Sequence, residues 1–139
     1  MSERRRYTGN GKYTFLKGAK LAHRGRPAPS VKTASGLAVR SKYERECVRF
    51  FEDNKIEFQY EPLILLAGRQ YRPDFYLPEY NLFIELCGYN HMPFYRDRNA
   101  YKRELYHQHK LKALFIDYNG KGSLPEILRK ELKSIGLDL

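Results

Sequence analysis

Residues 72–88 read RPDFYLPEYNLFIELCG, and this stretch predicts two strands joined by a tight turn. Pro78 prevents the first strand from continuing, and Asn81 tolerates the backbone angles that close a four-residue turn. With this turn, the antiparallel pairing sets Asp74 opposite Glu85. Like charges that face each other directly are destabilising unless something neutralises them. The hairpin is therefore the first place to look for a functional site.

The two faces of this hairpin differ in character. The same pairing sets Phe75, Tyr76 and Leu77 opposite Ile84, Phe83 and Leu82, in that order. Side chains alternate along a strand, so one face is apolar and is expected to lie in the core; it consists of Phe75, Leu77, Leu82, Ile84 and Leu86. The other face carries the two acids with Phe83 and Cys87. We expect this second face to carry the chemistry.

The rest of the chain alternates between helix and strand patterns. Apolar residues at helical spacing predict a helix over residues 41–54, in which Glu44 shares the inward face. The strand patterns cover residues 56–62, 63–77, 81–88 and 113–118, and further helices are predicted over 93–109 and 124–135. The order of helix, three strands, helix, strand and helix predicts an α/β fold.

Positive charge is concentrated at the N-terminal end of the chain. The net charge is +10, and residues 1–40 hold ten Lys or Arg against one acid, whereas residues 41–139 hold sixteen basic and fifteen acidic residues. We therefore expect a basic, largely flexible arm over 1–40 and one compact domain over 41–139. The basic residues of the arm are Arg4, Arg5, Arg6, Lys12, Lys17, Lys20, Arg24, Arg26, Lys32 and Arg40.

A polyanion is the natural partner of such an arm, and nucleic acid is favoured. The arm lacks an amphipathic helical stripe and a lipidation signal, so a membrane partner is not expected. No apolar run reaches the roughly 20 residues of a membrane span, and no signal peptide is evident. We expect a cytoplasmic, DNA-associated protein of a cell or a virus. Residues 23–29, HRGRPAP, resemble the core of an AT-hook, although a basic turn in a tail is the alternative.

The opposed acids have a specific chemical use. A divalent cation between Asp74 and Glu85 would neutralise them, and Glu44 and the backbone carbonyl of Leu86 would add the oxygen ligands that Mg²⁺ prefers. Each acid also has a structural alternative. Glu44 fits a helix capping box that begins at Ser41, and the other two acids could form salt bridges at strand ends. The two cysteines lack zinc-site spacing and are expected to be free thiols.

Four segments within residues 39–118 carry a family resemblance. VRSKYE, FQYEP, YRPDFYLPEYNLFIELCG and the predicted helix that follows resemble the PD-(D/E)XK nuclease superfamily, in particular its phage, resolvase-like and helicase-associated branches. The resemblance implies a restriction-endonuclease-like αβββαβ core, with a mixed sheet flanked by helices. It also implies hydrolysis of DNA phosphodiesters with Mg²⁺, or Mn²⁺ as a substitute, and metal-binding roles for Glu44, Asp74 and Glu85.

One residue departs from the family pattern. Cys87 stands where the family usually has a lysine, and a neutral thiol cannot supply positive charge. Some branches take that lysine from the following helix, where Lys102 is the best placed candidate. It shares a helical stripe with Tyr95, Arg98, Tyr106 and His109, and Arg98 is a further candidate for DNA contact. The alternative is that Lys102 lies on a solvated helix face.

These observations predict a Mg²⁺-dependent endodeoxyribonuclease, with Glu44, Asp74, Glu85 and Lys102 as catalytic candidates. The sequence has no evident base-reading module, so recognition of DNA structure is expected, with branched DNA as in resolvases. Targeting by a homodimer mate or a recruiting protein would serve the same purpose. The main alternative is a DNA-binding protein on a catalytically degenerate nuclease fold, and an RNA-directed nuclease is a third possibility.

Overall fold

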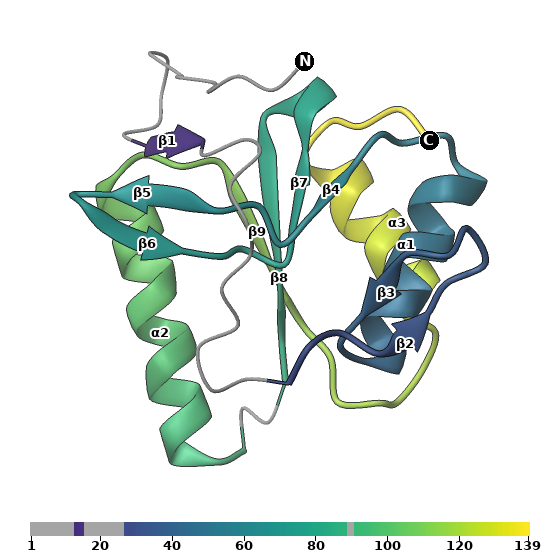
Figure 1. Cartoon of the computed structure of the whole chain (residues 1–139), viewed down its shortest axis with the longest axis horizontal. Helices are drawn as coiled ribbons and strands as arrows, with labels where there is room; N and C mark the ends of the chain where they lie inside the picture. Colours follow the sequence, from purple (N-terminus) through teal and green to yellow (C-terminus); the bar gives the residue numbers. More distant parts are fainter. Residues whose placement is uncertain (1–12, 16–26, 89–90) are drawn as a thin grey trace. The chain divides into compact units, whose positions relative to one another are not determined.

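The computed structural model describes residues 13–15, 27–88 and 91–139, which form two compact units (Figure 1). The first unit comprises strand β1 (Tyr13–Phe15) and residues 58–119, and the second comprises residues 27–57 and 120–139. Eight of the predicted nucleic-acid contacts lie outside the described residues, as does the Arg-Gly-Arg stretch at 24–26. They are Arg4, Arg5, Arg6, Lys12, Lys17, Lys20, Arg24 and Arg26.

A mixed four-stranded sheet forms the centre of the first unit (Figure 1). Its strands follow the order β4 (Gln59–Tyr60), β7 (Phe75–Leu77), β8 (Leu82–Cys87) and β9 (Ala113–Asp117). Strand β7 is antiparallel to both β4 and β8, and β9 runs parallel to β8. A parallel neighbour needs a crossover connection, and helix α2 (Pro93–Gln108) supplies it. The predicted α/β class with a mixed sheet is confirmed.

The hairpin of β7 and β8 has the predicted register. Phe75, Tyr76 and Leu77 pair with Ile84, Phe83 and Leu82. The turn is a short 3₁₀ helix over Pro78–Tyr80, and Asn81 follows it in the left-handed conformation, with φ 49° and ψ 48°. Asparagine adopts this conformation more readily than most residues, so the chain can turn here without glycine.

The predicted continuous strand over residues 63–77 is wrong. This stretch instead contains a second hairpin, β5 (Ile64–Leu66) and β6 (Arg69–Tyr71), before the chain reaches β7. The turn occupies Ala67 and Gly68, with φ values of 51° and 81°. A two-residue hairpin turn with positive φ at both positions matches the twist of the strands, and glycine adopts it at low cost. Strand β1 pairs with β5, so β1, β5 and β6 form a separate three-stranded sheet.

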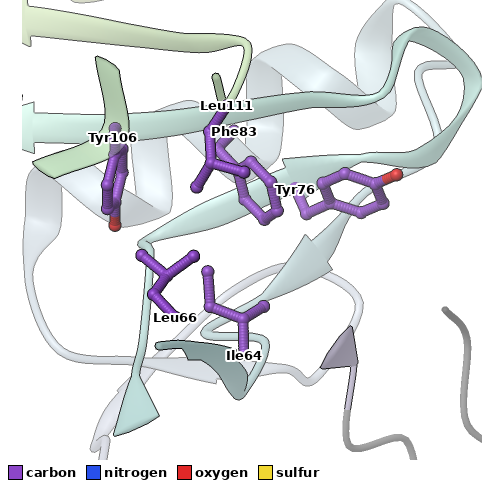
Figure 2. Close-up of a cluster of buried hydrophobic side chains, with 6 residues drawn as sticks. All are labelled: Ile64, Leu66, Tyr76, Phe83, Tyr106 and Leu111. Carbon is purple, nitrogen blue, oxygen red and sulfur yellow. The ribbon is translucent and has the colours of Figure 1, made fainter. Parts of the chain in front are cut away.

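The second hairpin changes the character of the face that was expected to carry the chemistry. That face is largely a second apolar core, because side chains from β5 and from the end of α2 cover it. Figure 2 shows the cluster, which consists of Ile64, Leu66, Tyr76, Phe83, Tyr106 and Leu111. The Tyr76 and Phe83 rings pack with centroids 4.7 Å apart. Polar groups are therefore confined to one end of this face, where β8 reaches Glu85.

The second unit is built from two helices and a small hairpin. Helix α1 (Lys42–Asp53) contacts α3 (Leu124–Ser134), and their buried faces include Val48, Phe51 and Leu128. Strands β2 (Val31–Lys32) and β3 (Ala38–Val39) pair with each other and contact α1. Residues 27–40 thus belong to this unit, which corrects their predicted place in a largely flexible arm. The described residues contain no helix that is long and apolar enough to span a membrane.

Candidate functional site

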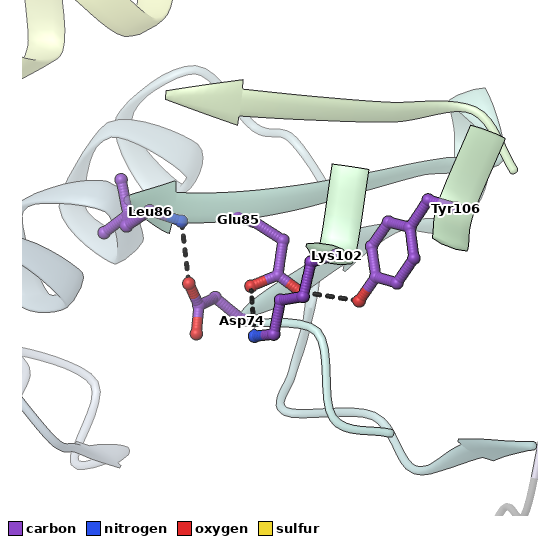
Figure 3. Close-up of polar contacts among 5 residues, drawn as sticks. All are labelled: Asp74, Glu85, Leu86, Lys102 and Tyr106. Carbon is purple, nitrogen blue, oxygen red and sulfur yellow. Dashed lines mark hydrogen bonds and ion pairs between the residues drawn. The ribbon is translucent and has the colours of Figure 1, made fainter. Parts of the chain in front are cut away.

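Glu85 is the centre of a polar cluster within the first unit. Its side chain is only 3% exposed, although a carboxylate in an apolar surrounding needs partners. The Tyr106 hydroxyl donates a hydrogen bond of 2.6 Å to Oε2, and the Lys102 Nζ lies 3.3 Å from Oε1 (Figure 3). Lys102 and Tyr106 are four residues apart on α2, so they lie on the same side of the helix and meet one carboxylate.

Asp74 joins this cluster from the start of β7. Its Oδ2 accepts a hydrogen bond of 2.7 Å from the backbone N–H of Leu86, the residue after Glu85 (Figure 3). Asp74 directly precedes the paired residues Phe75 and Ile84, so the chain brings the two acids to the same end of the hairpin as predicted. Burial, and after it the negative charges of Glu85 and Asp74, raise the pKa of Tyr106. The tyrosine therefore stays protonated and donates its hydrogen bond.

Lys102 does not lie on a solvated helix face. Its side chain is 25% exposed, and its ammonium is paired with a carboxylate that is almost fully buried. Tyr95 and Arg98, which belong to the same predicted stripe, are exposed nearer the start of α2. The stripe thus runs from the solvent to the acid pair, and Lys102 marks the point where it meets the cluster.

Cys87 faces the same side of β8 as Glu85 and is buried. Burial raises the pKa of its thiol to about 12, and the charges of Asp117 and Glu85 add to the effect. The thiol is therefore neutral at physiological pH and contributes no charge to the cluster. Cys47 is also a buried free thiol, so the prediction of two free cysteines is confirmed.

Glu44 lies in the second unit, in the first turn of α1. Ser41 caps this helix by accepting a hydrogen bond of 3.1 Å from the Glu44 N–H, and Glu44 Oε1 accepts one of 2.8 Å from the Arg40 N–H. The Ser41 half of the predicted capping box is thus present, whereas the Glu44 carboxylate bonds the N–H one residue before the N-cap. Its membership of the metal-binding set stays a prediction.

The remaining predicted DNA contacts are spread over both units. Lys32 is exposed on β2, and the Arg40 guanidinium donates a hydrogen bond to the Pro27 carbonyl. Arg98 is exposed on α2. Their contact with DNA also stays a prediction.

The acid pair fits a hard divalent cation in its donor chemistry. Two carboxylates at the same end of the β7–β8 hairpin and the Leu86 carbonyl are oxygen donors, which Mg²⁺ prefers, and such a site is completed by water and substrate. Within residues 13–15, 27–88 and 91–139, no three His, Cys, Asp or Glu side chains are gathered into a metal-binding group. Asp74, Glu85 and the Leu86 carbonyl thus stay the predicted ligand set within the first unit.

Comparison of the chain with models of protein families, with curated proteins and with solved structures found no match. The resemblance of residues 39–118 to the PD-(D/E)XK superfamily thus remains a hypothesis carried by the motifs themselves. Tyr106 is the residue of the cluster to which the sequence assigned no role. The available signal was its spacing of four residues from Lys102, but nothing in the sequence indicated that its hydroxyl meets Glu85.

The hydrogen bond from Tyr106 is expected to stabilise the fold. Tyr106→Phe keeps the ring in its apolar cluster and removes only the donor, which leaves a buried carboxylate oxygen with one partner fewer. We expect the free energy of unfolding to fall by about 1–3 kcal/mol, measured by urea denaturation. The matched control is Tyr80→Phe in the turn, where a change within about 0.5 kcal/mol is expected. Equal stability of the two variants would contradict the hydrogen bond.

Proposed function

We propose that the protein is a metal-dependent endodeoxyribonuclease that hydrolyses phosphodiester bonds in DNA. The order α1, β4, β7, β8, α2, β9 is compatible with the αβββαβ core of the restriction-endonuclease-like fold, with the β5–β6 hairpin as an insertion. The proposal uses the acids Asp74 and Glu85 as metal ligands. It assigns Lys102 the part that the motif lysine has in related nucleases.

One observation carries the proposal: the ammonium of Lys102 lies 3.3 Å from Glu85, on the face where Cys87 provides no charge. A nuclease of this class needs a cation beside its acids, since negative charge develops on the phosphate during hydrolysis. Lys102 meets this need from α2. An ordinary surface lysine would instead extend into solvent.

The residues have separate tasks in this proposal. Asp74, Glu85 and the Leu86 carbonyl would hold Mg²⁺, with Mn²⁺ as a substitute. When bound, the metal supplies a Lewis acid that binds the phosphate and lowers the pKa of the attacking water. The Leu86 N–H orients Asp74, and the Tyr106 hydroxyl orients Glu85. Lys102 stabilises the negative charge on the phosphate.

The choice of DNA rests on charge. The excess of basic residues over positions 1–40 would provide affinity that is mostly independent of sequence and falls with added salt. We propose structure-selective cleavage, with branched DNA as the substrate, and a homodimer mate or a recruiting protein as the source of targeting. These finer assignments follow from the resemblance to resolvase-like nucleases.

The test is cleavage of supercoiled plasmid and of a labelled four-way junction by purified protein in Mg²⁺, Mn²⁺ or EDTA. Cutting with either metal and none in EDTA would support a metal-dependent nuclease. Faster cutting of the junction than of a linear duplex of the same arm sequence would support structure selectivity. Cleavage that persists in EDTA would contradict the proposed chemistry.

The second candidate is a DNA-binding protein on a degenerate nuclease fold. The neutral, buried thiol of Cys87 favours it, because the usual motif cation is missing from β8. This candidate predicts DNA binding that weakens with salt, no cleavage with any metal, and binding that survives Asp74→Asn. The same purified protein distinguishes the two candidates, since only the first cuts.

A further inference from the structure

Helix α2 exposes large aromatic side chains between Phe94 and Tyr101, outside the acid cluster. Phe94 is 69% exposed and Tyr101 is 56% exposed, and Tyr95 beside Phe94 is 36% exposed. The Phe94 and Tyr95 rings contact each other edge to face, with centroids 5.4 Å apart. Large apolar groups that gather in one exposed place commonly mark an interaction surface.

Two of these rings lie on one side of the helix with an arginine between them. Phe94, Arg98 and Tyr101 follow the i, i+4, i+7 spacing of a single helix face, and all three are exposed. We call them the α2 aromatic face. At 1.5 Å of rise per residue, the two rings are about 10 Å apart along the helix axis. Each ring therefore offers its own stacking surface, with the guanidinium between them.

The charge of α2 indicates which partner suits this surface. The helix carries Arg96, Arg98, Lys102 and Arg103 against Asp97 and Glu104, and Arg98 lies within the aromatic face itself. Aromatic residues and arginine are also enriched at protein–protein interfaces, so this composition alone does not choose the partner. The excess of positive charge on the helix favours single-stranded nucleic acid, where rings stack on bases and cations contact phosphates.

The aromatic face adjoins the acid cluster through Arg98. Lys102, which is paired with Glu85, lies four residues after Arg98 on α2, so a strand bound at Arg98 would lie next to the acids. We propose that the α2 aromatic face binds unpaired nucleotides of the DNA substrate by stacking on Phe94 and Tyr101 and by contact of Arg98 with a phosphate. The position of these nucleotides next to the cleaved bond rests on the proposed function. The stacking itself does not.

The test is a binding measurement in EDTA, where no cleavage takes place. A fluorescein-labelled 20-nucleotide oligo(dT) and a 20-base-pair duplex are titrated with wild-type protein and with the Phe94→Ala/Tyr101→Ala variant, and anisotropy is recorded. Loss of stacking on two bases is expected to weaken oligo(dT) binding at least about tenfold. Duplex binding is expected to change less than about threefold, because its bases are already stacked and phosphate contacts dominate.

The matched control is Tyr43→Ala, which removes a tyrosine that is 45% exposed at the start of another helix. It should leave oligo(dT) binding unchanged, and circular dichroism should show that all variants are folded. Unchanged oligo(dT) affinity in the double variant, or an equal loss for duplex and single strand, would overturn the inference. Sedimentation velocity provides an additional measurement. A wild-type dimer that becomes a monomer in the double variant, with unchanged oligo(dT) affinity, would also overturn the stacking inference.

The result separates this inference from the proposed nuclease. Metal-dependent cutting by wild-type protein, with unchanged oligo(dT) binding in the variant, would leave the nuclease standing and reject the stacking surface. The absence of cutting with any metal, with a selective loss of oligo(dT) binding in the variant, would reject the nuclease and support the stacking surface.

Discussion

Asp74→Asn is expected to abolish metal-dependent cleavage of DNA while leaving the protein folded. The amide oxygen of asparagine can still accept the hydrogen bond from the Leu86 N–H, so the local structure should be retained. What is lost is one of the two negative charges that would bind the metal in the proposed site. The loss should exceed the roughly 10–100-fold that follows removal of a group that only supports a metal ligand.

The measurement combines plasmid cleavage in Mg²⁺ with titration of Mn²⁺ by electron paramagnetic resonance. The variant should lose both plasmid cleavage and Mn²⁺ binding. Its binding of duplex DNA in EDTA should be unchanged. Glu79→Gln is the matched control, because Glu79 is an exposed acid in the turn of the same hairpin. Cleavage by Asp74→Asn at the wild-type rate would show that Asp74 is not a metal ligand and would reject the proposed ligand set.

Lys102→Gln is expected to separate metal binding from cleavage. The variant removes the cation that would stabilise the developing charge, and loss of one such group in other enzymes lowers the rate by about 10²–10³-fold. Mn²⁺ binding should be retained or become tighter, because an ammonium that competes for Glu85 is gone. This variant should therefore lower the cleavage rate without weakening Mn²⁺ binding.

Single-turnover cleavage and Mn²⁺ titration of the same preparations are the appropriate readouts. Lys130→Gln provides the control, since Lys130 is an exposed lysine within a helix of the second unit. Full activity of Lys102→Gln would reject the assignment of this lysine. A parallel loss of metal binding and cleavage would instead mean that Lys102 holds Glu85 in place and has no separate part in the chemistry.

The features that the sequence predicted correctly depend on local signals. The turn after Leu77 was visible because Pro78 stops a strand and Asn81 accepts a left-handed conformation, and alternation then set the register. The helices over α1, α2 and α3 were predicted nearly to their ends for the same reason. Their apolar spacing and, for α1, the cap at Ser41 are short-range patterns.

The errors arose where distant parts of the chain decide the outcome. The composition on both sides of Ala67 and Gly68 is typical of strands, and it predicts one continuous strand through them. The glycine is the local signal that indicates the turn instead. The resulting β5–β6 hairpin covers the face of the β7–β8 hairpin that carries Phe83 and Glu85. The alternation of side chains along the strands gave no indication that this face is covered. The hydrogen bond between Tyr106 and Glu85 joins residues 21 positions apart, and no local pattern indicates such a contact.

The shared carboxylate of Glu85 has a consequence for how such a chain can diverge. Its two partners on α2 lie 17 and 21 positions further along the chain, and both depend on the same side chain. A chain that lost the glutamate alone would keep a buried hydroxyl and an ammonium without their acceptor, which carries a cost in stability. Among descendants of this sequence, positions 85, 102 and 106 should consequently be inherited together or be replaced together.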